Sequence, residues 1–223
     1  MRLLPLSGFV ALAFTASAGA QPGHSAQDVA RAVQQRYDGV RDFTARFVHV
    51  YQGGVLRKTV TEKGTVEIKK PGRMRWEYTD PEKKVFVADG SQIYSYIPAD
   101  RQVIVSPMPA EDQATTATLF LTGRGNLPRD FDVSFGDLPQ APAGTTVLKL
   151  VPRHAERDYD TLTLAVTPSN QIQMLSAVDR QKGRSTFIFS DIKENTELAD
   201  KIFAFKIPRG VDVVRSGNTQ ERR

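Results

Sequence analysis

Apolar and polar residues follow two different periods along this chain. Near the N-terminus, Val29, Val33 and Tyr37 recur at four-residue spacing, which predicts a helix over 28–37. Gly39 stands where that helix should end. Beyond it the period changes to two, the spacing of a strand with one apolar face. The pattern therefore predicts one helix followed by a largely extended chain.

Turn residues interrupt the alternating segments every ten or so positions. The predicted strands are 43–49, 60–70, 73–78, 85–88, 93–97, 103–105, 131–135, 146–151, 162–166, 172–178, 185–192 and 203–207. A short helical turn is expected over 195–200. Short strands at this spacing favour an antiparallel sandwich or barrel.

The alternation stops between Ser106 and Leu127. Apolar residues are grouped here, among them Leu119, Phe120 and Leu121, which predicts one or two short amphipathic helices. A helical insert near 106–127, between two blocks of strands, is a candidate lid. A plain connecting helix is the alternative.

The first twenty residues have the composition of a signal peptide. Arg2 is followed by a mostly apolar run over 3–14 and by small residues at 18–20. We expect residues 1–20 to be cleaved and 21–223 to form a single domain in an exported, periplasmic space. The alternative is an uncleaved N-terminal anchor.

Composition removes several classes of function. The chain has no cysteine, so it has no disulfide framework, thiolate metal site, cysteine nucleophile or N-terminal lipidated cysteine. Its net charge is +5, but basic and acidic residues are interleaved, which disfavours nucleic acid as a partner. No nucleophile-elbow or zinc-protease motif is present, and we expect His49 and His154 to be structural or exposed, with no metal site. The expectation is a protein that is not an enzyme; a hydrolase is the least favoured alternative.

A series of motifs in a fixed order resembles one known family. The motifs are DFTARF at 42–47, GTV at 64–66, KKPGRMRWEY at 69–78, DG at 89–90 with IYSY at 93–96, and FAFKIPRGVDV at 203–213. Together they resemble the outer-membrane lipoprotein carrier protein family, LolA, over nearly all of the chain beyond the signal peptide.

The resemblance implies a mainly β fold with an α-helical lid: an incomplete antiparallel β-barrel of about eleven strands around a hydrophobic cavity. It implies a monomeric periplasmic carrier without a cofactor. Such a carrier takes acylated lipoproteins from an inner-membrane ABC-type exporter and delivers them to an outer-membrane lipoprotein receptor. Because the chain has no cysteine, it cannot be that receptor in its anchored form. A carrier of another amphiphile (a glycolipid or an envelope pigment) and a lipid-sensing regulatory protein remain alternatives.

The resemblance also suggests which side chains line the cavity. The candidates are Phe47, Val66, Ile68, Met74, Trp76, Tyr78, Phe86, Tyr94 and Tyr96, with Leu119, Phe120 and Leu121 on the lid. Ordinary core packing is the alternative for each of them. Arg73 and Arg75 alternate with the apolar residues and are expected on a solvated face.

Lys70 is the candidate latch. It shares a face with Val66 and Ile68, an unusual position for a charged residue. In many members of the family an arginine stands at this position and links barrel to lid. Lysine keeps the charge but lacks the planar fork of donors, so a latch with several bonds is less expected here. A strand-end lysine whose ammonium reaches water is the alternative.

Overall fold

The computed structural model describes residues 24–53, 58–108, 125–154 and 159–216. The predicted signal segment and the lid candidates Leu119, Phe120 and Leu121 lie outside these ranges. The helices are α1 (Ala26–Asp38), α3 (Leu127–Asp130) and the 3-10 helices η1 (Pro98–Asp100) and η2 (Asp200–Phe203). The strands are β1 (Asp42–Gln52), β2 (Thr59–Lys69), β3 (Arg73–Asp80), β4 (Lys84–Asp89), β5 (Gln92–Ile97), β6 (Gln102–Pro107), β7 (Phe131–Phe135), β8 (Thr146–Pro152), β9 (Thr161–Val166), β10 (Ile172–Val178), β11 (Arg184–Glu194) and β12 (Asp212–Arg215).

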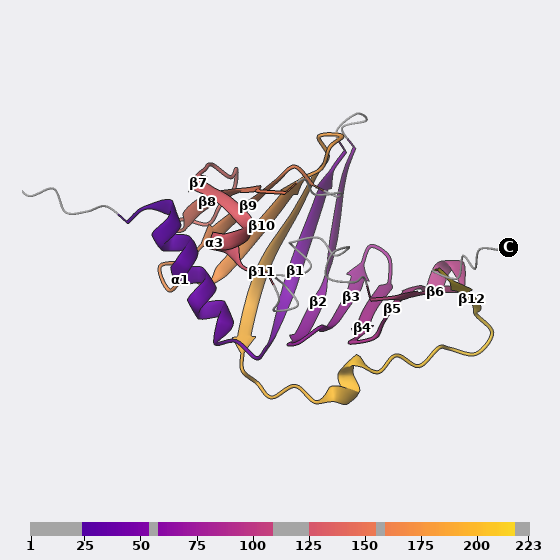
Figure 1. Ribbon diagram of the computed structural model, residues 1–223. Helices are drawn as coiled ribbons and strands as arrows, with labels where there is room; N and C mark the ends of the chain where they lie inside the picture. The colour runs from indigo at the N-terminus through magenta and orange to yellow at the C-terminus, as the bar shows by residue number, and fades with distance from the viewer. Residues whose placement is uncertain (1–23, 54–57, 109–124, 155–158, 217–223) are drawn as a thin grey trace, which may run out of the picture.

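The described strands form one twelve-stranded open, curled sheet (Figure 1). Their order is β12-β6-β5-β4-β3-β2-β1-β11-β10-β9-β8-β7. Two meanders, β1–β6 and β7–β11, are joined where β1 pairs with β11. The mainly β fold class predicted from the sequence is confirmed. Within the described residues, no helix combines the length and apolarity needed to cross a membrane.

Helix α1 begins at a reciprocal capping box. Ser25 accepts a hydrogen bond from the Asp28 backbone N–H, and the Asp28 carboxylate accepts one from the Ser25 backbone N–H. The helix then packs its apolar stripe against the sheet, with Ala30 and Val33 buried among side chains of β7, β8 and β9. This packing defines the inner face of the sheet as the face that α1 covers. Figure 1 shows α1 lying across the β7–β11 end of that face.

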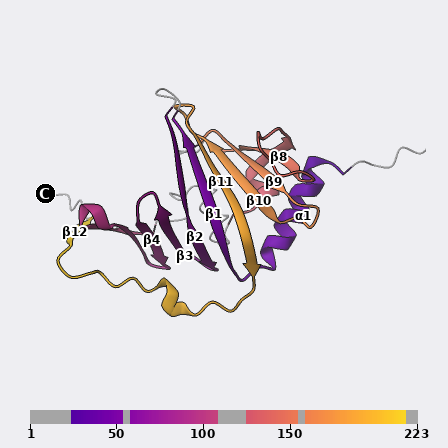
Figure 2. The same cartoon turned by 180° about the vertical axis from the view of Figure 1, so that it is seen from behind.

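A long C-terminal segment crosses the opposite, outer face. Residues 195–211, which we call the strap, run from β11 at the middle of the sheet to β12 at its far edge (Figures 1 and 2). Phe203 on the strap is only 1% exposed, and η2 contacts β3 and β4. The Asp200 carboxylate lies 2.6 Å from Lys69 Nζ and 2.8 Å from Arg73 Nη1. The strap is therefore fastened by an apolar anchor and by ion pairs.

Three sequence-based expectations about this region are wrong: the helical turn at 195–200, the strand at 203–207, and the solvated position of Arg73 and Arg75. The helical turn expected at 195–200 lies instead at η2, and 203–207 forms no strand. The last strand is β12, which pairs in parallel with β6. The reason is that Phe203 buries itself across the outer face, so its segment crosses the strands and cannot join a ladder beside them. For the same reason Arg73 and Arg75 are not simply solvated: Arg75 Nη1 donates to the Ile202 carbonyl at 3.3 Å.

Candidate functional site

A small apolar pocket lies between α1 and the inner face. Val33 and Tyr37 of α1 form one wall, and Phe43, Leu175 and Phe189 of the sheet form the other. Its volume of about 60 Å³ is far below the roughly 300–1,000 Å³ of typical ligand pockets. A long acyl chain therefore does not fit in this pocket with α1 in its present position.

An aromatic floor continues from this pocket along the inner face of β1, β3 and β11. We give this name to Phe47, Trp76, Tyr78, Phe187 and Phe189. The Phe47 ring centroid lies 5.1 Å from that of Trp76 and 4.9 Å from that of Tyr78. Trp76 lies 5.3 Å from Phe187, and Phe187 lies 6.3 Å from Phe189, which also lines the pocket. The pocket and the floor thus form one continuous apolar surface.

Most of the cavity candidates lie together on this inner face. Phe47, Val66 and Ile68 are at most 2% exposed and form the buried layer of one cluster. Met74, Trp76 and Tyr78 are half-buried against that layer, and Phe86 meets Tyr78 with ring centroids 5.7 Å apart.

Tyr94 and Tyr96 are the exception, and the structure corrects their placement. Phe86 of β4 pairs with Ser95 of β5, so Ser95 shares the inner face and its two neighbours point to the outer face. There both tyrosine rings pack against Phe205 of the strap, at 5.3 and 5.9 Å. They therefore form the seat of the strap and not a wall of the pocket.

Lys70 joins the sheet to the end of α1. Its Nζ donates to the Tyr37 carbonyl and lies 3.6 Å from the centre of the Tyr37 ring. A cation is favourable here because the last carbonyls of a helix carry partial negative charge. Burial lowers the pKa of the Lys70 ammonium, although the nearby Asp38 carboxylate opposes that shift. Contacts of Lys70 with the predicted lid segment fall outside the described residues.

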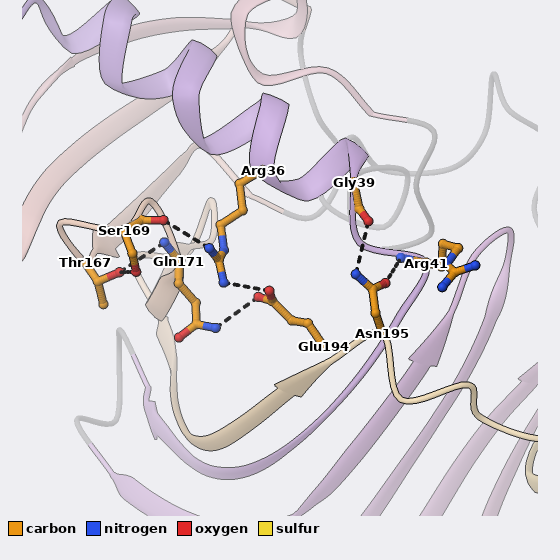
Figure 3. Close-up of polar contacts among 8 residues, drawn as sticks. All are labelled: Arg36, Gly39, Arg41, Thr167, Ser169, Gln171, Glu194 and Asn195. Atoms are coloured by element: carbon orange, nitrogen blue, oxygen red, sulfur yellow. Dashed lines mark hydrogen bonds and ion pairs between the residues drawn. The ribbon is translucent and has the colours of Figure 1, made fainter.

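A second connection, which the sequence reasoning missed, lies on the same turn of α1 (Figure 3). Arg36 Nη2 lies 2.6 Å from Glu194 Oε2, and Arg36 Nη1 donates to the Ser169 carbonyl at 3.2 Å. Gln171 Nε2 donates to the other Glu194 oxygen at 3.0 Å. We call Arg36, Ser169, Gln171 and Glu194 the clamp. Its only sequence signal is a basic residue in the last helical turn, and the partners are more than 130 positions away.

The clamp is expected to hold α1 closed over the pocket. Arg36→Met removes the ion pair and the bond to Ser169, and hydrogen bonds to charged groups contribute about 1.5–3 kcal/mol each. We expect amide hydrogen exchange over residues 33–38 and the entry rate of a fluorescent acyl probe both to rise about tenfold. Arg31→Met is the matched control, because Arg31 pairs with Asp28 on the exposed side of the same helix. Equal rates in both variants would show that the clamp does not restrain α1.

Four polar side chains lie at the other end of the aromatic floor. His49 Nδ1 is 3.1 Å from Glu62 Oε2, and His49 Nε2 is 2.7 Å from Ser185 Oγ. Lys84 Nζ donates to the second Glu62 oxygen at 2.7 Å. We call His49, Glu62, Lys84 and Ser185 the polar cluster. The sequence analysis expected His49 to be structural or exposed because no catalytic motif is present. It did not find the cluster, since the four side chains come from four different strands.

The polar cluster predicts a pH dependence of stability. Burial lowers the pKa of His49 below the ordinary imidazole value of 6.5, although the hydrogen bond to Glu62 acts in the opposite direction. As the pH is lowered, the unfolded chain therefore takes up this proton at a higher pH than the folded protein does. The free energy of unfolding consequently falls as the pH falls below about 6.5. His49→Gln should lack that decrease, as measured by urea unfolding at pH 7.5 and 5.5. Identical pH slopes for both proteins would contradict the assignment.

Comparisons with known proteins agree with this architecture. The family model described as "Outer membrane lipoprotein carrier protein LolA" matches residues 38–206. The outer-membrane lipoprotein carrier protein of Legionella pneumophila (strain Corby) is 31% identical over 191 residues, which cover 85% of this chain and 91% of that relative. The protein of the same description from Hahella chejuensis (strain KCTC 2396) is 29% identical, covering 79% and 83%. The solved structure of an uncharacterized conserved protein from Thermus thermophilus has a TM-score of 0.52 at 15% identity, and the match covers 85% of this chain and 98% of that one.

Proposed function

Because the chain belongs to the LolA outer-membrane lipoprotein carrier family, we propose that it binds the acyl chains of lipoproteins in the periplasm and carries them from the inner to the outer membrane. The observation that supports this most directly is the apolar pocket under α1, continuous with the aromatic floor. The partners would be an inner-membrane ABC-type exporter and an outer-membrane lipoprotein receptor. The protein would act by binding and release, without a reaction of its own.

The energetics of an acyl chain explain why such a surface needs a cover. Each methylene contributes about 0.8 kcal/mol on leaving water, so a long chain requires on the order of 10 kcal/mol of apolar contact from its carrier. A surface that offers this much contact would promote aggregation if it stayed exposed in the empty protein. Here α1 lies over part of that surface, and Lys70 and the clamp hold the C-terminal end of α1 to the sheet. Closure of α1 when empty and displacement when loaded would satisfy both requirements.

The test is to purify the protein from the periplasm and identify what it carries. We expect mass spectrometry of the extracted protein to find acylated lipoprotein or its N-terminal lipid, and a fluorescent acyl probe to bind and be displaced by it. Depletion of the protein should then leave lipoproteins at the inner membrane. A carried glycolipid or pigment, with lipoproteins sorted normally after depletion, would support the carrier of another amphiphile instead. Absence of both co-purified acyl ligand and probe binding would contradict any carrier.

A further inference from the structure

The polar cluster is placed where a guest on the aromatic floor would end. The His49 ring stacks on Phe187 with centroids 4.2 Å apart and planes 3° apart. Phe187 stacks in turn on Phe189, which lines the pocket. From Phe43 at the pocket to His49, strand β1 spans roughly 20 Å at about 3.4 Å per residue. That length is comparable with an extended long-chain acyl group, so a tail inserted toward α1 leaves its polar end beside the cluster.

The hydrogen bonds define the protonation of the cluster. An ionised carboxylate can only accept hydrogen bonds, so His49 Nδ1 is protonated and donates a hydrogen bond to Glu62. His49 Nε2 then accepts a hydrogen bond from the Ser185 hydroxyl. The Lys84 ammonium has three N–H donors, of which Glu62 takes one, while Glu82 lies 3.7 Å away. The cluster therefore presents N–H donors of Lys84, while the charge of Lys84 is offset by the adjacent Glu62.

Stability alone does not account for these side chains. Polar groups removed from water on an apolar face are unfavourable unless fully bonded, and apolar replacements of such groups are often as stable. Binding sites, in contrast, combine apolar walls with a few placed polar groups that orient the ligand. The four groups come from β1, β2, β4 and β11 and converge on one point of the inner face.

We propose that the polar cluster is a subsite for the neutral carbonyl linkage of an acylated cargo, an ester or an amide, and that it discriminates against free fatty acids. This rests on the proposed carrier function. Lys84 would donate to the carbonyl oxygen of the linkage, and Glu62 would accept from a neighbouring hydroxyl or amide N–H. A free carboxylate in the same place faces the Glu62 carboxylate, and like charges at short range oppose binding.

The order Ser185, His49, Glu62 matches that of a hydrolytic triad, but the surroundings do not favour hydrolysis. Ser185 lies within β11, which pairs with β1 on one side and β10 on the other, so the neighbouring backbone N–H groups serve the ladders. Acyl transfer needs free N–H donors aimed at the developing oxyanion. The arrangement therefore favours binding of a linkage and not its cleavage.

The experiment is a displacement assay with two soluble ligands of the same tail, 1-monododecanoylglycerol and dodecanoate, below their micelle-forming concentrations at pH 7.5. We expect the protein to bind the glycerol ester at least about tenfold more tightly. Glu62→Gln removes the repelling charge and leaves the Lys84 ammonium uncompensated, so the ratio should fall to about one or below. Lys84→Gln keeps an N–H donor but leaves Glu62 uncompensated, so the ratio should rise further. Glu82→Gln is the control: its carboxylate is 3.7 Å from Lys84 and half exposed, and the ratio should stay unchanged.

The outcomes separate this inference from the carrier function. Equal ratios in the unmodified protein and in both cluster variants would overturn the subsite and leave acyl binding intact. No displacement by either ligand would overturn both proposals. Release of dodecanoate from the ester, followed in the same samples, would show that the cluster reacts with the linkage and would overturn a binding role. Because the two variants change the ratio in opposite directions, a general loss of folding cannot imitate the expected result.

Discussion

Trp76→Glu is expected to weaken the binding of a fluorescent acyl probe about a hundredfold or more while the protein stays folded. Trp76 is half-buried on the aromatic floor, so a carboxylate at this position would remain partly hydrated in the empty protein. A bound acyl chain would remove that water. Burying a polar group without a partner costs roughly 2–7 kcal/mol, and a hundredfold loss of affinity corresponds to about 2.7 kcal/mol. The measurement is a probe titration, with circular dichroism to establish that the fold is retained.

Tyr96→Glu is the matched control for this experiment. It adds the same charge to an aromatic position of the same sheet, but on the outer face against Phe205. Probe affinity should change less than twofold, even if the strap is loosened and the melting temperature falls. Equal losses of affinity in the two variants would mean that the guest does not lie on the inner face at Trp76.

Local pattern was enough to predict most strands and the main helix. The two-residue alternation of 73–78 gives Met74, Trp76 and Tyr78 one face, and the structure places all three in the same cluster. Helix α1 extends one or two residues beyond the predicted 28–37 at each end, since the Ser25 and Asp28 cap begins it earlier. These features depend only on neighbours in the chain, so period and capping residues are sufficient to find them.

Alternation does not say which face is the inner one. Tyr94 and Tyr96 alternate as regularly as Trp76 and Tyr78, but the register of β4 with β5 turns them outward. That outcome depends on the turn between the strands and on a strap more than a hundred positions later, which offers Phe205 as a partner. A sequence pattern of period two carries no information about such a distant cover.

The latch illustrates the same limit for charged groups. Lys70 was predicted to link the barrel to the lid near 106–127, most of which lies outside the described residues; the contacts that the structure does show run from Lys70 to the Tyr37 carbonyl and ring of α1. The planar, multi-bonded guanidinium contact that lysine cannot make is instead provided by Arg36, from α1 toward Ser169 and Glu194. Lys70 thus places a positive charge at the end of α1, and Arg36 makes the contact with several hydrogen bonds. Neither partner of Arg36 could be found from spacing, because the turn between β9 and β10 and the end of β11 reach α1 only in the folded sheet.

Gly64→Ala is expected to lower the free energy of unfolding by about 3 kcal/mol, a large effect for one added methyl group. A Cβ at Gly64 would lie 1.9 Å from the Glu77 carbonyl oxygen and 2.8 Å from Phe47 Cζ. Backbone and a ring in the buried layer of the floor must therefore both shift, and neither is a flexible side-chain end. Gly64 stands at the register shift between β2 and β3, where an added Cβ would meet the Glu77 backbone of β3.

Urea unfolding at pH 7.5 measures this loss, with Gly53→Ala as the control. A Cβ at Gly53 meets its nearest atom at 3.7 Å, an ordinary contact, so the free energy of unfolding should stay within about 0.5 kcal/mol. Because the Gly64 methyl group also displaces Phe47, probe affinity should fall together with stability, whereas a purely backbone effect would leave the affinity of the folded fraction unchanged. A stable Gly64→Ala protein would mean that β2 and β3 can separate at this point without disturbing the floor, and the absence of a side chain at Gly64 would then not be what allows Phe47 to lie beside Trp76 and Tyr78.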